Sequence, residues 1–150
     1  MLKKIATALL LLASVGPLVA LEFNEGFVRG LPPTQTTTAA FFTVTNPSDE
    51  VWSLTRVHSP AAGSVEIHEH INRGGTMQMR QLMALDIPAG ESVVFAPGGL
   101  HLMLIGLTKP LREGDEVSLQ FESEKGAVVE IVFPVISVVN EHRHHHHAHH

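Results

Sequence analysis

The chain has 150 residues, of which 44% are apolar, so it is long enough to form one domain with a substantial core. It contains no cysteine, which excludes disulfides, thiolate nucleophiles and zinc–cysteine sites. Its formal charge of −5 comes without a basic patch, so nucleic acid is not an expected partner.

The first 20 residues have the features of an export signal. Lys3 and Lys4 supply a positive start, and residues 5–15 form a short apolar core that a Gly-Pro pair ends. We predict cleavage after Ala20 and a periplasmic location, with an uncleaved membrane anchor as the alternative. Removing this segment takes away two lysines and no acid, which leaves 8 basic and 15 acidic residues and a formal charge of −7.

Residues 21–140 consist of short apolar stretches separated by turn residues, a pattern typical of a β-sandwich. The strands expected in chain order are residues 38–46, 51–58, 64–70, 76–83, 92–95, 100–107, 116–122 and 127–139. No segment after the signal keeps a helical apolar period for three turns. We therefore predict an all-β fold, a Greek-key sandwich of two antiparallel sheets, with an up-and-down barrel as the alternative.

The last two of these strands have distinct patterns. Apolar and polar residues alternate over residues 116–122, which indicates a strand with one solvated face. Residues 127–139 are almost continuously apolar and rich in β-branched side chains, which favours burial on both faces. Pro134 interrupts this strand and cannot donate to a ladder, so we expect it at an edge or a bulge.

Histidines and methionines are concentrated in the middle of the chain. Before the C-terminal tail, residues 21–140 contain four of each, and most of these lie within residues 68–103. Alternate side chains of a strand point to the same face, so two donors separated by one residue project together. Three such pairs occur: His68 and His70, Met77 and Met79, and His101 and Met103. Two adjacent strands that each present a pair could close a four-donor site.

The neighbours of His68 indicate which face the donors occupy. Val65, Ile67 and Ile71 share one face of the expected strand. His68 and His70 share the other face, so they point away from the core. A partly solvated position suits a metal that is handed to another protein, because closed structural sites retain their ions.

The donor types indicate copper. Thioether sulfur is soft and selects Cu(I), whereas zinc would require thiolates or carboxylates, and a blue-copper centre would require a cysteine. The predicted ligands are His68, Met79, His101 and Met103. Taken singly, Met77 and Met83 are expected to be core fillers, and His58 is expected to be a solvated or hydrogen-bonded histidine.

At these residues the sequence resembles the PCuAC family of periplasmic copper chaperones. That family's pattern is a histidine, ten residues, a methionine, twenty-one residues and then histidine-any-methionine. Here His68, Met79, His101 and Met103 have this spacing. The similar segments are VEIH at 65–68, MQMR at 77–80, AAFFTVTN at 39–46 and IPAGESVVFAPGGLHLMLIGL at 87–107. The resemblance covers about residues 26–136.

The resemblance implies a cupredoxin-like β-sandwich without the blue-copper cysteine. It also implies a Cu(I) site made by His68, Met79, His101 and Met103. The implied destination is the CuA centre of cytochrome c oxidase, with subunit II and a Sco-type thiol protein as recipients. His70 stands where the family commonly has methionine, so it is a possible auxiliary ligand, as is Met77, which shares the face of Met79.

The C-terminal segment 141–150 is rich in histidine. The seven histidines are His142, His144, His145, His146, His147, His149 and His150. An expression tag is one interpretation, but Arg143 and Ala148 interrupt the run, which favours a native tail. Imidazole without sulfur prefers Cu(II), so we predict that this tail captures Cu(II), and less strongly as the pH falls below about 6.5.

The sequence contains no nucleophile elbow, phosphate-binding loop or paired-carboxylate site, so we expect a binding protein and not an enzyme. The leading interpretation is a monomeric chaperone that carries Cu(I). A copper-buffering or resistance protein is the alternative with the same chemistry. An exported interaction sandwich whose histidines and methionines are incidental is the alternative from another class.

Overall fold

The computed structural model describes residues 20–138, which form ten β-strands joined by turns and short loops. The strands are β1 (Glu22–Gly30), β2 (Thr37–Thr45), β3 (Trp52–His58), β4 (Ala62–Arg73), β5 (Thr76–Leu82), β6 (Leu85–Ile87), β7 (Ser92–Phe95), β8 (His101–Leu107), β9 (Glu116–Ser123) and β10 (Val128–Ser137). Within these residues, no helix is long and apolar enough to cross a bilayer.

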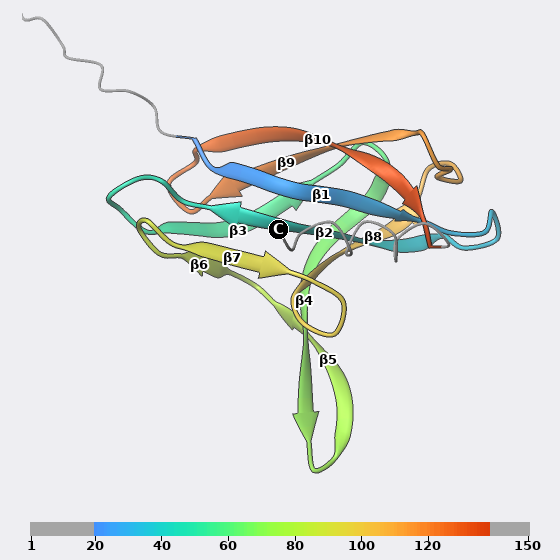
Figure 1. The fold of residues 1–150 in the computed structure, drawn as a ribbon, viewed down its shortest axis with the longest axis horizontal. Coiled ribbons are helices and arrows are strands. Elements are labelled where there is room, and N and C mark those ends of the chain that lie inside the picture. The colour runs from blue at the N-terminus through green and yellow to red at the C-terminus, as the bar shows by residue number, and fades with distance from the viewer. Residues whose placement is uncertain (1–19, 139–150) are drawn as a thin grey trace, which may run out of the picture.

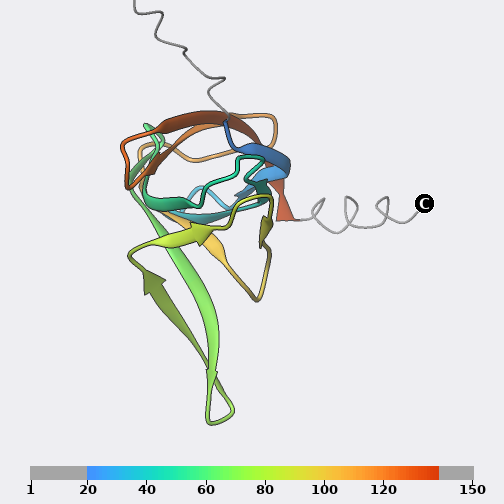
Figure 2. The same cartoon turned by 90° about the vertical axis from the view of Figure 1, so that its left-hand side faces the viewer.

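The strands form one sheet, in the order β5-β4-β8-β2-β1-β10-β9-β3-β6, with β7 paired to β2. Because β3 also pairs with β4, the strands from β4 around to β3 close into a barrel (Figures 1 and 2). Strands β1 and β10 are parallel, and the other ladders between strands are antiparallel.

The prediction of an all-β fold is confirmed, but the division into two separate antiparallel sheets is wrong. The ladders run continuously around the barrel, and one of them is parallel. Nor is the barrel up-and-down, because neighbouring strands such as β2 and β8 are not consecutive in the chain, and β1 and β10 are parallel. Apolar periodicity reports which face of a strand is buried, whereas the closure of a sheet depends on pairings between distant strands.

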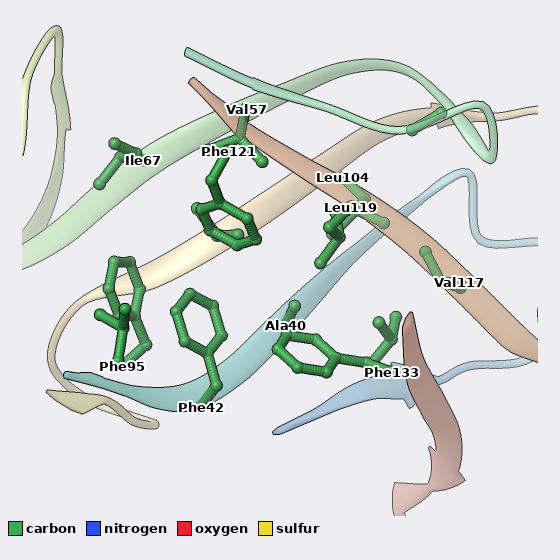
Figure 3. Packing of buried hydrophobic residues seen from close by; sticks show 14 of the residues in the cluster. Ala40, Phe42, Val57, Ile67, Phe95, Leu104, Val117, Leu119, Phe121 and Phe133 are labelled. Atoms are coloured by element: carbon green, nitrogen blue, oxygen red, sulfur yellow. The ribbon is translucent and has the colours of Figure 1, made fainter. Parts of the chain in front are cut away.

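The barrel interior is filled by aromatic and aliphatic side chains. The rings of Phe42 and Phe95 stack with centroids 4.3 Å apart, and Phe121 meets Phe42 edge-on at 5.6 Å (Figure 3). In β9 the alternate residues Val117, Leu119 and Phe121 are buried. The predicted single solvated face of this strand is confirmed.

Strand β10 is buried on one face only, which corrects the expectation of burial on both. Phe133 and Val135 point into the core, whereas Val128 and Val132 are 57% and 48% exposed. The expectation assumed layers on both sides of the strand, but the outer surface of a barrel wall faces solvent. Pro134 lies just before β1 joins β10 at Val135, beside the bulge in β1.

The bulge in β1 explains why residues 22–30 lack a strand signature in the sequence. The register shifts between Asn24 and Phe27, and Glu25 has a φ of 53°. A Cβ on Gly26 would lie 2.1 Å from Cε1 of Phe133, so only glycine allows that ring to pack there. The alternation of apolar residues is interrupted at this point.

Strand β6 was also not predicted, because it has only three residues.

Strands β4 and β5 form a hairpin that extends away from the barrel (Figures 1 and 2). The predicted turn is confirmed, since Gly74 and Gly75 have φ values of 61° and 85°, which glycine adopts without strain. The first part of β4 pairs with β8, and its last part, from Ile67 to Arg73, pairs with β5. The hairpin therefore places the imidazole and thioether side chains of β4 and β5 next to the barrel wall formed by β8.

Candidate metal centre

The predicted donors come together where β8, β4 and β5 lie side by side. His68 of β4 is directly opposite His101 of β8, and His70 of β4 is directly opposite Met79 of β5. Directly opposed residues of paired strands project on the same side of the sheet. Met103 is two residues beyond His101 and therefore shares its face. The three strands thus present imidazoles and thioethers together.

A cavity of about 300 Å³ lies at this face and is lined by His70, Met79, His101 and Met103. Its other walls come from β1, β2 and the loop before β8. His68 is not part of its lining, although its ring is close to that of His101. Three of the four predicted ligands therefore surround one cavity, together with His70, which the sequence marked only as auxiliary.

Burial favours the neutral form of His101. Its side chain is 6% exposed, and Nδ1 lies 3.2 Å from the carbonyl oxygen of Gly99. A carbonyl only accepts, so Nδ1 donates its proton there and Nε2 keeps its lone pair. Burial is the main cause that lowers the pKa of His101, and His70 and His68 nearby lower it further, against the raising effect of the Gly99 hydrogen bond. A neutral imidazole is the form that binds metal.

His68 leaves one ring nitrogen unused. Its Nε2 lies 2.7 Å from Oε2 of Glu66, an acceptor, so Nε2 carries the proton and Nδ1 the lone pair. Nδ1 is buried and has no hydrogen-bond partner among residues 20–138. A buried polar atom without a partner is costly, and a metal ion would satisfy it. The residues present therefore fit a bound metal.

The ring separations also fit a shared ion. The ring centroids of His68 and His101 are 5.8 Å apart, and those of His70 and His101 are 5.2 Å apart. Two imidazoles that bind one tetrahedral ion at the usual nitrogen distance of about 2.0 Å have centroids about 5 Å apart. Either imidazole of β4 can therefore share an ion with His101 after a small side-chain adjustment.

The methionines of β5 are exposed, and this corrects one expectation. Met77 and Met83 are 57% and 79% exposed, so neither is a core filler. Met77 lies on β5, an edge strand of a projecting hairpin that packs against no second layer, and Met83 follows directly after that strand. Met79 is 55% exposed but reaches the cavity. Outside this region His58 is exposed, in accordance with its expected solvated role.

Strand β8 supports the site from the other side. Leu102 and Leu104 are fully buried in the barrel, while His101 and Met103 face the cavity. Among residues 20–138, no group of three or more His, Asp or Glu side chains has an arrangement that could hold a metal ion. The predicted signal (residues 1–19 of it) and the histidine tail lie outside the described residues.

Fold and cavity together define the class of structure, a closed β-barrel with a surface pocket lined by imidazole and thioether groups. The chain belongs to the LpqE-like family, whose model, described as "Putative lipoprotein LpqE-like", matches residues 21–135.

Two solved structures share the fold. The "Copper-bound PCuAC domain from PmoF2" is 23% identical with a TM-score of 0.65, over 78% of this chain and 92% of that one. The "Solution structure of CuI-DR1885 from Deinococcus Radiodurans" is 29% identical with a TM-score of 0.62, over 82% of this chain and 80% of that one. The predicted resemblance to the PCuAC family is confirmed.

Among curated proteins, "Putative lipoprotein Lxx21020" of Leifsonia xyli subsp. xyli (strain CTCB07) is 34% identical over 99 residues, or 65% of this chain. "Uncharacterized protein RP573" of Rickettsia prowazekii (strain Madrid E) is 32% identical over 84 residues, or 55% of this chain. The matched segments span 60% and 46% of the lengths of these two relatives.

Proposed function

We propose that this protein is an exported copper chaperone that binds Cu(I) as cargo and passes it on without catalysing a reaction. The observation that carries the proposal is the convergence of Met79, Met103 and the neutral, buried His101 on one cavity. Two thioethers and an imidazole form a soft donor set, which favours Cu(I) over zinc or Cu(II). The two similar structures, of a copper-bound PCuAC domain from PmoF2 and of CuI-DR1885, support the same assignment.

The proposed Cu(I) ligands are His68, Met79, His101 and Met103. His101 provides Nε2, because Nδ1 is committed to Gly99. His68 provides the buried Nδ1, whose lone pair has no partner while Glu66 holds the opposite nitrogen. The two thioethers complete a four-donor set. In this arrangement the closed barrel is the rigid support for the ligands that a cupredoxin-like sandwich was expected to provide.

Transfer of the ion is proposed to begin at the exposed side of the site. Met79 is 55% exposed on an edge strand, so an incoming ligand can reach the ion there while β8 still holds it. We propose a Sco-type thiol protein and cytochrome c oxidase subunit II as recipients, and the CuA centre as the destination. Copper buffering or resistance is the alternative use of the same site.

The signal-like residues 1–20 support export to the periplasm, in agreement with the lipoprotein names of the family and of one relative. The histidine tail is proposed to capture Cu(II) near the Cu(I) site. Strand β10 ends at Ser137, which pairs with Gly30, and the neighbouring Arg29 and Leu31 line the cavity. Strand β10 therefore ends near residues that line the cavity.

The direct test is a Cu(I) titration against a competing chelator. The double variant M79L/M103L keeps the side-chain volume but removes both thioethers, so we expect it to lose at least about a hundredfold in Cu(I) affinity. M77L/M83L, which removes two exposed methionines outside the cavity, is the matched control and should bind as the parent does. Equal affinity of all three proteins would instead support an interaction sandwich with incidental histidines and methionines.

Chaperone and buffer are separated in cells. Deletion of the gene under limiting copper should reduce CuA assembly, and the parent chain should restore it. Normal CuA assembly combined with greater copper sensitivity would favour the buffering alternative.

A further inference from the structure

His70 is not needed by the four-ligand Cu(I) set, yet it lines the same cavity as three of those ligands. It is directly opposite Met79 in the β4–β5 ladder, and it lines the cavity that Met79, His101 and Met103 also line. Its ring meets that of His101 edge-on, with the planes at 75°. A side chain in this position contributes a third imidazole to the site.

The three imidazoles have nitrogens available for a metal. The ring centroids of His68 and His70 are 5.8 and 5.2 Å from that of His101, both slightly more than the separation of about 5 Å expected for a shared ion. His101 keeps Nε2 free, and His68 keeps a buried Nδ1 without a partner among the described residues. The carboxylate of Glu66 lies 2.7 Å from Nε2 of His68 and fixes the orientation of that ring.

We propose that the pocket has a second ligand set, His68, His70 and His101, which holds Cu(II). The inference rests on the proposed function, because both ligand sets contain His101, which lines the cavity, and His68, whose ring lies beside that of His101. Three nitrogens suit Cu(II), whereas the thioethers of Met79 and Met103 suit Cu(I). The three rings are not yet placed as a closed site. The cavity of about 300 Å³ leaves room for the side-chain rotations that would close it.

The second set has a clear consequence for the cargo. A site with two imidazoles and two thioethers loses much of its affinity when copper is oxidised, because thioether binds Cu(II) poorly. With His70 present, the pocket exchanges thioether for imidazole and retains the ion. A methionine at position 70 would leave the Cu(I) set intact and remove this property.

The test uses the full-length chain with its seven tail histidines replaced by glutamine, so that the tail contributes no imidazole. This parent is compared with the same chain carrying H70M, and with H58M as the matched control, since His58 is exposed and outside the cavity. Cu(II) and Cu(I) affinities are measured by chelator competition. Electron paramagnetic resonance of the Cu(II) form counts the coupled nitrogens, and circular dichroism confirms folding.

We expect the parent and H58M to bind one Cu(II) with three coupled nitrogens. H70M should lose one nitrogen and at least about tenfold in Cu(II) affinity, while its Cu(I) affinity is preserved. Equal Cu(II) affinity and spectra for H70M and H58M would overturn the inference, as would a parallel loss of Cu(I) and Cu(II) affinity in H70M. Failure of the proposed function has a different signature, because the parent would then bind Cu(I) no better than M79L/M103L.

Discussion

Strands β8 and β5 both supply soft donors to the pocket, but they differ in almost every physical respect. On β8, His101 is 6% exposed, and Leu102 and Leu104 anchor the strand in the barrel core. On β5, Met79 is 55% exposed, and the strand is the free edge of a projecting hairpin. In the proposed function, the ion has to be held on one side of the pocket and reached by another protein on the other side. The buried strand β8 suits the first task, and the exposed strand β5 suits the second.

The barrel core, in which β8 is anchored, and the hairpin that carries β5 should differ most in their contribution to folding. Phe121 is 1% exposed and packs against Phe23 and Phe42, with centroids 4.8 and 5.6 Å apart. F121A should therefore lower the free energy of unfolding by about 3 to 5 kcal/mol. The matched hairpin variant M77A should change it by less than about 0.5 kcal/mol, because Met77 is exposed. Denaturant unfolding measures the free energy of unfolding of both variants. Comparable losses in F121A and M77A would contradict the proposed difference between barrel core and hairpin.

Copper binding should also distinguish the two strands. M103L removes a partly buried donor beside His101, where water cannot easily replace it, so we expect a loss of about a hundredfold in Cu(I) affinity. M79L removes an exposed donor, and a loss of about tenfold is expected, with faster release of copper to a chelator. Chelator competition and stopped-flow transfer measure these effects. A larger loss of Cu(I) affinity in M79L than in M103L would mean that the hairpin, and not β8, contributes more to holding the ion.

The smallest effect concerns the pH dependence of the apo protein. Burial lowers the pKa of His101 below its ordinary value of 6.5, so the unfolded chain binds this proton more readily than the folded chain does. The free energy of unfolding should therefore fall as the pH drops below 6.5 toward the folded pKa, and it should be unaffected by His101 above that range.

H101Q should flatten this pH dependence, which thermal unfolding between pH 7 and pH 5 would measure. The control is H58Q, because His58 is exposed on β3. If stability falls with decreasing pH as steeply in H101Q as in the parent, protonation of the buried imidazole is not the cause of the loss of stability at acid pH.

The sequence alone allowed a large part of this structure to be predicted. The alternation in residues 116–122 corresponds to β9, and the two glycines after Arg73 correspond to the tight turn between β4 and β5. The spacing of two between His101 and Met103 correctly indicated a shared face, because both line the cavity. These features are local, because they depend on the direction of neighbouring side chains along one strand.

Other features could not be predicted from local patterns. The β1 strand was hidden by its bulge at Gly26, and the exposure of Met77 follows from a hairpin that has no second layer above it. The position of His70 in the cavity follows from its pairing with Met79, which depends on the β4–β5 register. Registers between strands and their bends are properties of the assembled sheet.

The sequence by itself determined that the chain is all-β, that it has no thiol chemistry, and that its donors are imidazole and thioether. Residue type and alternation are sufficient for these conclusions. Only the tertiary structure decided that the sheet closes into a barrel, that His68 lies opposite His101, and that His70 joins Met79 at the cavity. The physical reason is that these contacts join segments distant along the chain, and their geometry exists only once the barrel has closed.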